Sequence, residues 1–214
     1  MERISLESGL DACVKKSAEV LKSGGMILFP TDTLYGLGAD AFSDAAVDKI
    51  YAIKGRDEKK PIHCIVTDIA MAEEYAEVTD DTRLLFERLL PGGLTVILKK
   101  REAVVGGIAR GLDTIGIRIP NHDFCAQLAH AFGRPLTATS ANISGLEPKR
   151  SLSDILEQLG DSAQKIDLIV DAGDLPPSAP STVVDLSGEE PAILREGAIS
   201  VADVWNAIRS ERDN

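Results

Sequence analysis

Hydrophobic positions recur along the chain at the spacing of helices and in short runs typical of buried strands. Leu10, Val14, Ala18 and Leu21 are three or four residues apart, so they share one face of a helix. The glycines of "SGG" at 23–25 are predicted to end that helix. Further helices are predicted to begin at 43–44, to lie near 68–76, 80–90, 123–132 and 152–159, and to begin near 200.

Strands are predicted where short runs rich in Val, Ile and Leu separate these helices. Because strands and helices alternate, we expect one α/β domain. The short turn "SGEEP" at 187–191 favours antiparallel pairing beside parallel pairs, and so a mixed, twisted sheet. The proline-rich segment 171–181 suits an ordered surface loop or lid. The predicted strands are 26–29, 61–66, 94–100, 114–120, 135–140, 166–173, 181–186 and 192–197.

Composition narrows the class of protein. The formal net charge of −11 argues against a broad nucleic-acid surface, which requires a basic face. No apolar run approaches the ~20 residues that span a bilayer. The charged N-terminus lacks the apolar core of a signal peptide, so we expect a cytoplasmic protein. Cys13, Cys64 and Cys125 show no CxxC pairing and are interpreted as small buried side chains.

The segment "YAIKGRDEKKP" at 51–61 gathers cations in this acidic chain. Lys54, Arg56, Lys59 and Lys60 lie within seven positions. Cations near a helix C-terminus suit the helix dipole, so a solvated helix end is one reading. A docking place for a ligand with several negative charges is the other.

The stretch "FPTDTLYGLGAD" offers hydroxyls and a carboxylate directly after a strand that ends at Pro30. Ligands of α/β proteins sit at the carboxyl ends of strands, so this stretch is a candidate site edge. We expect it to form a turn that contains Gly36 and Gly38. A capped turn in which Asp32 satisfies backbone amides is the structural alternative.

Two further features suit an anionic ligand. Ser140 and Asn142 follow the strand "PLTATS", where hydroxyls and free backbone amides suit phosphate oxygens, although both residues also favour helix N-caps. Arg118 and Arg195 lie among apolar residues, and each is predicted to pair with an internal carboxylate or with a ligand.

The rest of the sequence excludes several kinds of site. No P-loop or complete GxGxxG motif is present, and no histidine lies in a recognisable triad or metal pattern. His122 and His130, on or near the 123–132 helix, are expected at the surface. Chemistry by positioning and charge neutralisation, as in nucleotidyl transfer, fits these residues best.

Seven stretches, taken together, resemble a known family. They are "GGMILFPTDTLYGLGADA", the Lys-x-Arg of Lys54 and Arg56, "LPGGLTVIL", "GIRIP", "TSANISG", "STVVD" and "LREG". In this order they resemble the YrdC/Sua5 family of threonylcarbamoyl-AMP synthases over residues 10–200. The resemblance implies an open twisted sheet around a concave ligand cavity. It also implies a single catalytic domain at 1–214 without the fused C-terminal domain of the Sua5 type.

The resemblance implies a nucleotidyltransferase that converts L-threonine, bicarbonate and ATP, with Mg²⁺, into threonylcarbamoyl-AMP and pyrophosphate. The product would supply the t6A modification of tRNA through a separate transferase of the TsaD/Kae1 type. No protein metal site is implied. By the resemblance, the catalytic set that grips the phosphates is Lys54, Arg56, Ser140 and Asn142; Lys60, Thr114 and Arg195 lie on the ATP side; and Thr33, Tyr35, Arg118 and Ser181 line the threonine pocket.

One departure and two alternatives remain open. Longer relatives carry a threonine-pocket histidine where this chain has Ile65, and His63 lies two residues earlier on the same strand face. A YciO-like paralogue with a different activity is one alternative, which the Lys-x-Arg and Ser-x-Asn pairs argue against. An RNA-binding module is the other, which the acidic charge argues against, although a local tRNA contact stays open.

Overall fold

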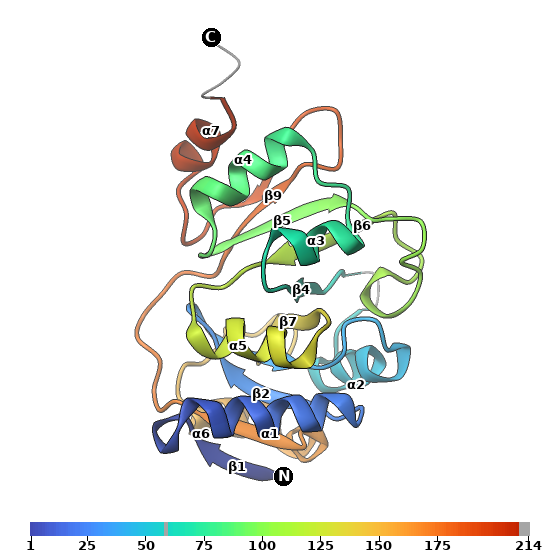
Figure 1. Cartoon of the computed structure of the whole chain (residues 1–214). Helices are drawn as coiled ribbons and strands as arrows, with labels where there is room; N and C mark the ends of the chain where they lie inside the picture. The colour runs from blue at the N-terminus through green and yellow to red at the C-terminus, as the bar shows by residue number, and fades with distance from the viewer. Residues whose placement is uncertain (58–59, 210–214) are drawn as a thin grey trace.

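The computed structural model of the chain describes residues 1–57 and 60–209 (Figure 1). The strands of this part of the chain form one sheet in the order β1-β8-β2-β3-β7-β4-β6-β5-β9-β10. They are β1 (Glu2–Ser5), β2 (Ile27–Pro30), β3 (Tyr35–Gly38), β4 (His63–Ile65), β5 (Leu94–Lys99), β6 (Thr114–Arg118), β7 (Leu136–Ser140), β8 (Leu168–Asp171), β9 (Thr182–Asp185) and β10 (Ala192–Arg195). The helices are α1 (Leu10–Lys22), α2 (Asp44–Lys54), α3 (Ile69–Tyr75), α4 (Asp80–Leu89), α5 (Asp123–Phe132), α6 (Leu152–Leu159) and α7 (Val201–Arg209).

The predicted α/β domain with a mixed sheet is confirmed. Strands β1 and β2 pair with β8 in parallel, as β4 does with β6 and β5 with β9. The pairs β2–β3, β3–β7, β4–β7 and β5–β6 are antiparallel. The "SGEEP" turn joins β9 to β10 in the antiparallel pairing that was expected.

Two predictions about the N-terminal half were incomplete or wrong. Strand β1 was not predicted, and Gly36 and Gly38 lie in strand β3 rather than in a turn. Glycines occupy these two positions of β3 because the strand packs closely against β2. A Cβ atom on Gly38 would lie 2.7 Å from Cε1 of Phe29, and one on Gly36 would lie 3.3 Å from the same ring atom.

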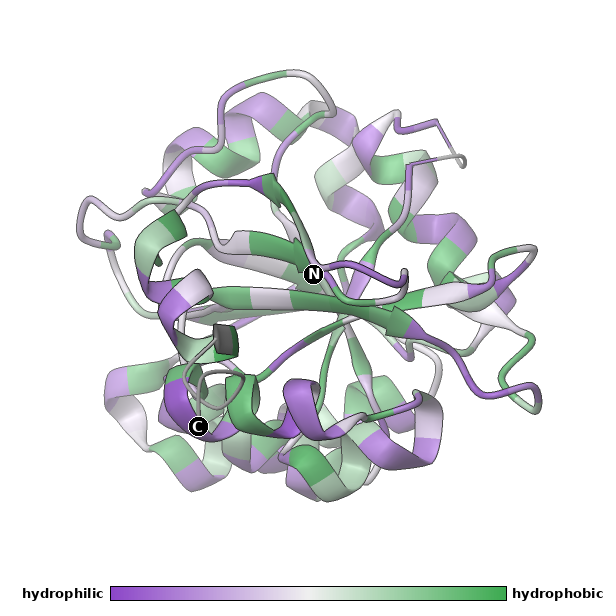
Figure 2. Ribbon diagram, turned by 90° about the horizontal axis from the view of Figure 1, so that it is seen from above, coloured by the Kyte–Doolittle hydropathy of each residue, from purple (hydrophilic) through white to green (hydrophobic). Residues whose placement is uncertain are grey.

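Helices cover both faces of the sheet, as Figure 2 shows from above. Ile27 and Phe29 of β2 point into one apolar cluster, where α1 and α5 lie side by side (Figure 1), whereas Leu28 points into the other. The second cluster takes in α2, α4, α6 and α7. Such alternation along a strand is what a sheet buried on both faces requires.

The three cysteines are buried and unbonded to one another, as predicted. Burial raises the pKa of each thiol, to about 12 for Cys64. They are therefore packing residues. No helix within residues 1–57 and 60–209 is both long and apolar enough to cross a membrane.

Strand β7 links the two halves of the sheet. On one side, Thr139 and Ser140 pair with β3, and Leu136 and Thr137 bond to Asp40 and Ala39 just after it. On the other side, β4 pairs only with Leu136, Thr137 and Ala138, so the sheet opens beside the last two residues of β7. The candidate site lies at this place.

Candidate functional site

A cavity of about 160 Å³ opens at the middle of the sheet. It is bounded by the β2–β3 hairpin, by β6 and β7, and by the segment that leads into β9. Among the described residues that line it, three are arginines and none is Asp or Glu. The lining residues include Thr31, Thr33, Tyr35, Arg56, Pro61, His63, Thr95, Arg118, Ser140, Pro180, Ser181 and Arg195.

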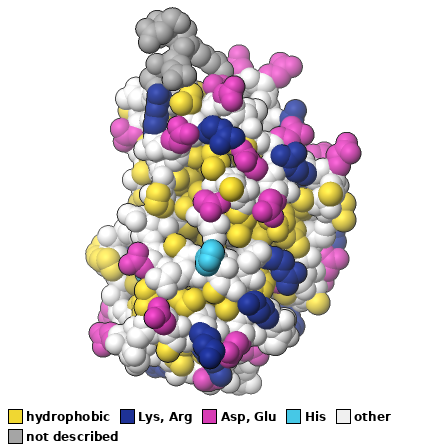
Figure 3. Space-filling model, viewed as in Figure 1, with side chains coloured by type: hydrophobic (Ala, Val, Ile, Leu, Met, Phe, Trp, Pro, Cys, Tyr) yellow, Lys and Arg dark blue, Asp and Glu magenta, His cyan; other side chains and the backbone are white. Residues whose placement is uncertain are grey.

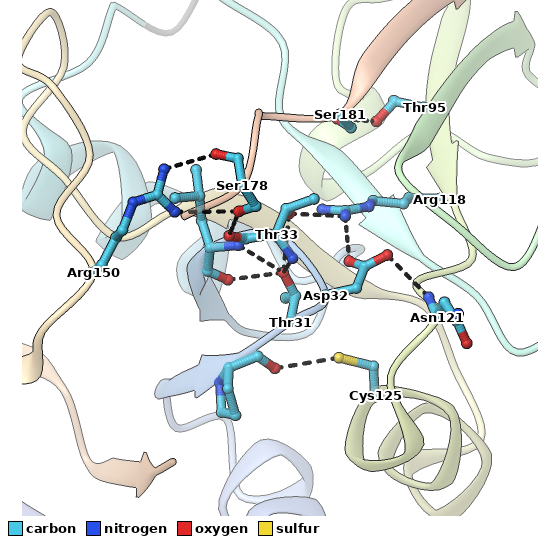
Figure 4. Close-up of polar contacts among 12 residues, drawn as sticks. Thr31, Asp32, Thr33, Thr95, Arg118, Asn121, Cys125, Arg150, Ser178 and Ser181 are labelled. Atoms are coloured by element: carbon cyan, nitrogen blue, oxygen red, sulfur yellow. Dashed lines mark hydrogen bonds and ion pairs between the residues drawn. The ribbon is translucent and has the colours of Figure 1, made fainter. Parts of the chain in front are cut away.

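Arg118 lies on one wall of the cavity, where it is 8% exposed. Its Nη2 donates to Oδ1 of Asp32 and, at 2.8 Å, to Oγ1 of Thr33 (Figure 4). Asp32 in turn accepts from the backbone amide of Asn121 at 3.0 Å. The expected internal carboxylate partner of Arg118 is therefore Asp32. The buried Nε of Arg118 has no hydrogen-bond partner among the described residues, so it is an orphaned buried donor.

Thr31, rather than Asp32, caps the turn between β2 and β3. Its Oγ1 accepts from the amides of Thr33 and Leu34 at 3.1 and 3.2 Å. The Oγ1 atoms of Thr31 and Thr33 also lie 3.2 Å apart. The turn is therefore held by side-chain hydroxyls, and it presents Thr33 to Arg118.

The segment 172–181, from here on the strap, leads from β8 towards β9, and its last residues, Pro180 and Ser181, line the cavity. The Tyr35 hydroxyl donates to the carbonyl of Gly173 at 2.8 Å and accepts from the amide of Ala172 at 2.9 Å. At the other end, the hydroxyls of Ser181 and Thr95 lie 2.9 Å apart. The predicted ordered loop is thus confirmed, and cavity residues bond to both of its ends.

Arg195 of β10 reaches the same wall as Ser181. Its Nε and Nη2 donate to the Ser181 carbonyl at 3.1 and 2.7 Å. Burial, and after it the charge of Arg118, lowers the pKa of Arg195. Like charges are thus held close together here, which an anionic ligand would offset.

Arg56 follows the end of α2 and also lines the cavity. Gly55, in the left-handed region at φ 55°, ends the helix. The Arg56 side chain is fixed because Nε donates to the Lys60 carbonyl at 3.1 Å and Nη2 to the Pro61 carbonyl at 2.9 Å. The Lys60 side chain is exposed and does not line the cavity. Lys59 lies outside the described residues.

Lys54 joins the Lys-x-Arg segment to the Ser-x-Asn segment. Its Nζ donates to the carbonyl of Ser140, to the carbonyl of Asn142 at 2.9 Å and to Oδ1 of Asn142 at 3.2 Å. The Lys54 carbonyl accepts from the Ser144 amide at 2.8 Å. The side chain is 1% exposed, and burial, with the charge of Arg56, lowers its pKa to about 7.

His63 lies in the cavity, where the sequence left its role open. Its ring packs against Gly116 of β6, where an added Cβ would lie 2.4 Å from Cδ2. Burial, followed by the charges of Arg195, Arg56 and Arg118, lowers its pKa to about 4. The imidazole is therefore neutral near pH 7. Ile65 is fully buried in the apolar cluster of α1 and α5.

His122 departs from its expected surface place. It is half-buried, and its Nδ1 has no hydrogen-bond partner among the described residues. Burial lowers its pKa despite the nearby carboxylates of Asp32 and Asp123. His130 is exposed, as predicted.

The cavity thus brings together residues that the sequence singled out separately. The four residues of the predicted threonine pocket all line it, and so do Arg56, Ser140 and Arg195. Lys54 and Asn142 lie directly behind Ser140. Thr114, at the start of β6, and Lys60 are not among the lining residues, and their ATP-side roles stay predictions. Arg150 and Ser178, which hold the strap, were missed because neither belongs to a recognisable motif.

The fold and site define a class: an α/β domain whose mixed sheet opens into a small cavity lined by arginines and hydroxyls. The family model named for Sua5, YciO and YrdC, described as "Telomere recombination", matches residues 19–197. The chain therefore belongs to the Sua5/YciO/YrdC family.

Curated relatives match most of the chain. A threonylcarbamoyl-AMP synthase of Pyrococcus abyssi is 35% identical over 91% of this chain and 57% of its own length. A putative threonylcarbamoyl-AMP synthase of Methanocaldococcus jannaschii is 38% identical over 87% of this chain and 88% of its own length. This chain thus spans little more than half of the Pyrococcus protein but most of the Methanocaldococcus one.

Solved structures agree on the fold. Pyrococcus abyssi Sua5 in complex with L-threonine superposes with a TM-score of 0.87 at 32% identity, covering 97% of this chain and 60% of that one. Escherichia coli YciO superposes with a TM-score of 0.82 at 26% identity, covering 95% of this chain and 98% of that one.

Proposed function

We propose that this chain is an L-threonylcarbamoyl-AMP synthase, a nucleotidyltransferase that makes threonylcarbamoyl-AMP and pyrophosphate from L-threonine, bicarbonate and ATP. The observation that carries the proposal is the cavity, in which Arg56, Arg118 and Arg195 converge with hydroxyls and without a lining carboxylate. The relatives named threonylcarbamoyl-AMP synthase and the threonine-bound Pyrococcus structure support this substrate class.

The threonine end of the site is built around Arg118. Asp32 and Thr33 fix the orientation of its guanidinium, and the Arg118 side chain lines the cavity, where it can meet the carboxylate of the amino acid. Thr33 and Ser181 offer hydroxyls for the amino and hydroxyl groups. A cavity of about 160 Å³ is smaller than the ~300–1,000 Å³ of sites that enclose drug-sized ligands. It therefore suits one small acid, with ATP along the open edge.

The phosphate end uses fixed positive charge. When the carbamate oxygen attacks the α-phosphorus, negative charge moves onto the departing pyrophosphate. Arg56 and Arg195 are held by backbone carbonyls, so they can stabilise that charge without reorganising. The Ser140 hydroxyl orients an oxygen. We assign Lys54 and Asn142 to holding the Ser140 loop, because all three ammonium hydrogens of Lys54 have oxygen acceptors there.

Four parts of the proposal are inferred from the reaction rather than from the cavity. Mg²⁺ would accompany the triphosphate and neutralise part of its charge. The described residues contain no group of three or more His, Cys, Asp or Glu side chains placed to hold a metal, so no protein ligand is assigned to it. The t6A transferase partner, a tRNA contact and a cytoplasmic location are likewise proposed from the activity. On the face seen in Figure 3, acidic and basic side chains are interspersed, which favours a local tRNA contact over a broad one.

The test is pyrophosphate release from ATP that requires both L-threonine and bicarbonate. We expect release only with all three substrates, and Arg56→Ala should lower turnover by about 100-fold or more, the scale for removing a transition-state donor. Arg83→Met, which removes an exposed ion pair with Glu73, is the matched control and should keep wild-type turnover. Release without threonine, or none at all, would favour a YciO-like activity instead.

A further inference from the structure

The strap is poorly able to hold its own shape. Pro176, Pro177 and Pro180 carry no backbone N–H, and all three are exposed. The bonds of Tyr35 and of Ser181 secure only its two ends. The middle of the strap must therefore be held by groups outside it.

Arg150 supplies these groups. Its Nη1 donates to the Pro176 carbonyl at 3.0 Å. Figure 4 shows its two contacts with Ser178: Nη1 donates to the hydroxyl at 3.2 Å and Nη2 to the carbonyl at 2.7 Å. The carbonyl of Arg150 also accepts from the Leu175 amide at 3.2 Å. The half-buried guanidinium of Arg150 therefore bonds to the middle of the strap.

The contacts continue from the strap into the cavity. The Ser178 hydroxyl donates to the carbonyl of Thr33, and the Thr33 hydroxyl accepts from Arg118 at 2.8 Å. Figure 4 shows Arg150, Ser178, Thr33 and Arg118 in one row. An unbroken series of hydrogen bonds therefore joins a residue outside the cavity to the guanidinium that faces the ligand.

We propose that Arg150 is a positioning residue for the amino-acid end of the cavity. It clamps the strap at Ser178, and Ser178 in turn fixes the Thr33 backbone against which Arg118 is oriented. Arg150 does not line the cavity, so it acts through Ser178 and Thr33. This inference rests on the proposed function for its substrate, L-threonine, but not for its geometry.

The test compares the effect of losing Arg150 on the KM values of the two substrates, L-threonine and ATP. In Arg150→Met, we expect the KM for L-threonine to rise about tenfold while the KM for ATP stays within about twofold. Arg150 holds Ser178, which bonds to Thr33, whereas the strap meets Arg195 at Ser181, whose hydroxyl also lies 2.9 Å from that of Thr95. Arg150→Lys, which keeps a single donor group, should recover part of the loss. Arg83→Met is again the control, with both KM values unchanged.

A double variant checks that the effect passes through Ser178. Ser178→Ala should raise the threonine KM in the same way. The double variant Arg150→Met/Ser178→Ala should be less impaired than the product of the two single effects, because both remove the same series of contacts. An unchanged threonine KM in Arg150→Met, an equal rise in both KM values, or fully multiplicative effects would overturn the proposal.

Amide hydrogen exchange tests the clamp by Arg150 without relying on the catalytic activity. Amides of the strap should exchange faster in Arg150→Met than in the wild type, with α1 and α5 unchanged. Unchanged strap exchange would overturn the clamp even if the enzyme is a synthase. Faster strap exchange in a chain that releases no pyrophosphate would instead refute the proposed function and leave the clamp standing.

Discussion

Lys54 lies in an unusual environment for an ammonium group. It is 1% exposed, and the acceptors of its Nζ are two carbonyl oxygens and one amide oxygen rather than a carboxylate. The family resemblance implied that the Lys-x-Arg and Ser-x-Asn segments meet. The sequence did not show that Lys54 points inward while Arg56 faces the cavity, because helix periodicity does not fix the direction of a side chain at a helix end.

Stability should therefore depend on pH through Lys54. Its pKa is lowered from 10.5 to about 7 in the folded chain. Below pH 7 both folded and unfolded chains carry the proton, and above it the unfolded chain binds more protons, so folding becomes more favourable as pH rises. We expect the free energy of unfolding of the wild type, relative to Lys54→Met, to rise by roughly 1 kcal/mol per pH unit between pH 7 and 9. Urea unfolding of both proteins at pH 6, 7, 8 and 9 measures this difference in the free energy of unfolding. If the difference does not change with pH, the pKa of Lys54 is not lowered by burial.

Other residues of the site could not be read from the sequence. His63 enters the cavity because Gly116, on the neighbouring strand β6, leaves space for its ring. Arg150 reaches Ser178 across 28 positions of the chain. Such contacts depend on strand order and loop path, which local patterns do not specify.

At the scale of elements, the pattern predicted the helices and most strands, because their apolar faces are long and regular. Strand β3 was missed because its sequence "YGLG" contains two glycines, which lower β-propensity and suggest a turn. In the structure these glycines instead allow the ring of Phe29 on β2 to lie against β3. The β2–β3 hairpin is what presents Thr31, Thr33 and Tyr35 to the cavity.

Gly38→Ala tests this packing. Its Cβ would lie 2.7 Å from Cε1 of Phe29 and 3.0 Å from Cγ1 of Ile27, so we expect a loss of roughly 1–3 kcal/mol in the free energy of unfolding, as for other overpacked cores. Gly188→Ala is the control, because its nearest neighbour would be 3.7 Å away. Urea unfolding of both variants provides the comparison. If Gly38→Ala and Gly188→Ala are equally stable, β2 and β3 can move apart without a loss of stability, and the close packing is not required.

At the scale of the whole molecule, the cavity draws on both halves of the sheet. Thr33 and Tyr35 come from the half that contains β2 and β8, whereas Thr95 and Arg118 come from the half that contains β5 and β6. Strand β7 pairs with strands of both halves. The alternation of elements predicted one α/β domain, and the short "SGEEP" turn predicted a mixed sheet. Strand order, however, comes from pairings between distant segments, which periodicity leaves undetermined.

A ligand in this cavity should stabilise the whole sheet. If L-threonine binds as proposed, 100 times its Kd should raise the free energy of unfolding by about 2.7 kcal/mol. Because the ligand would touch Thr33 on one side of β7 and Arg118 on the other, amide exchange should slow both in β2 and β8 and in β5 and β6. Acetate at equal ionic strength is the control, since it has the carboxylate but neither the amino group nor the hydroxyl. Protection confined to one half of the sheet would show that the bound ligand does not contact both sides of β7. The cavity would then not bind its ligand with residues from both halves of the sheet.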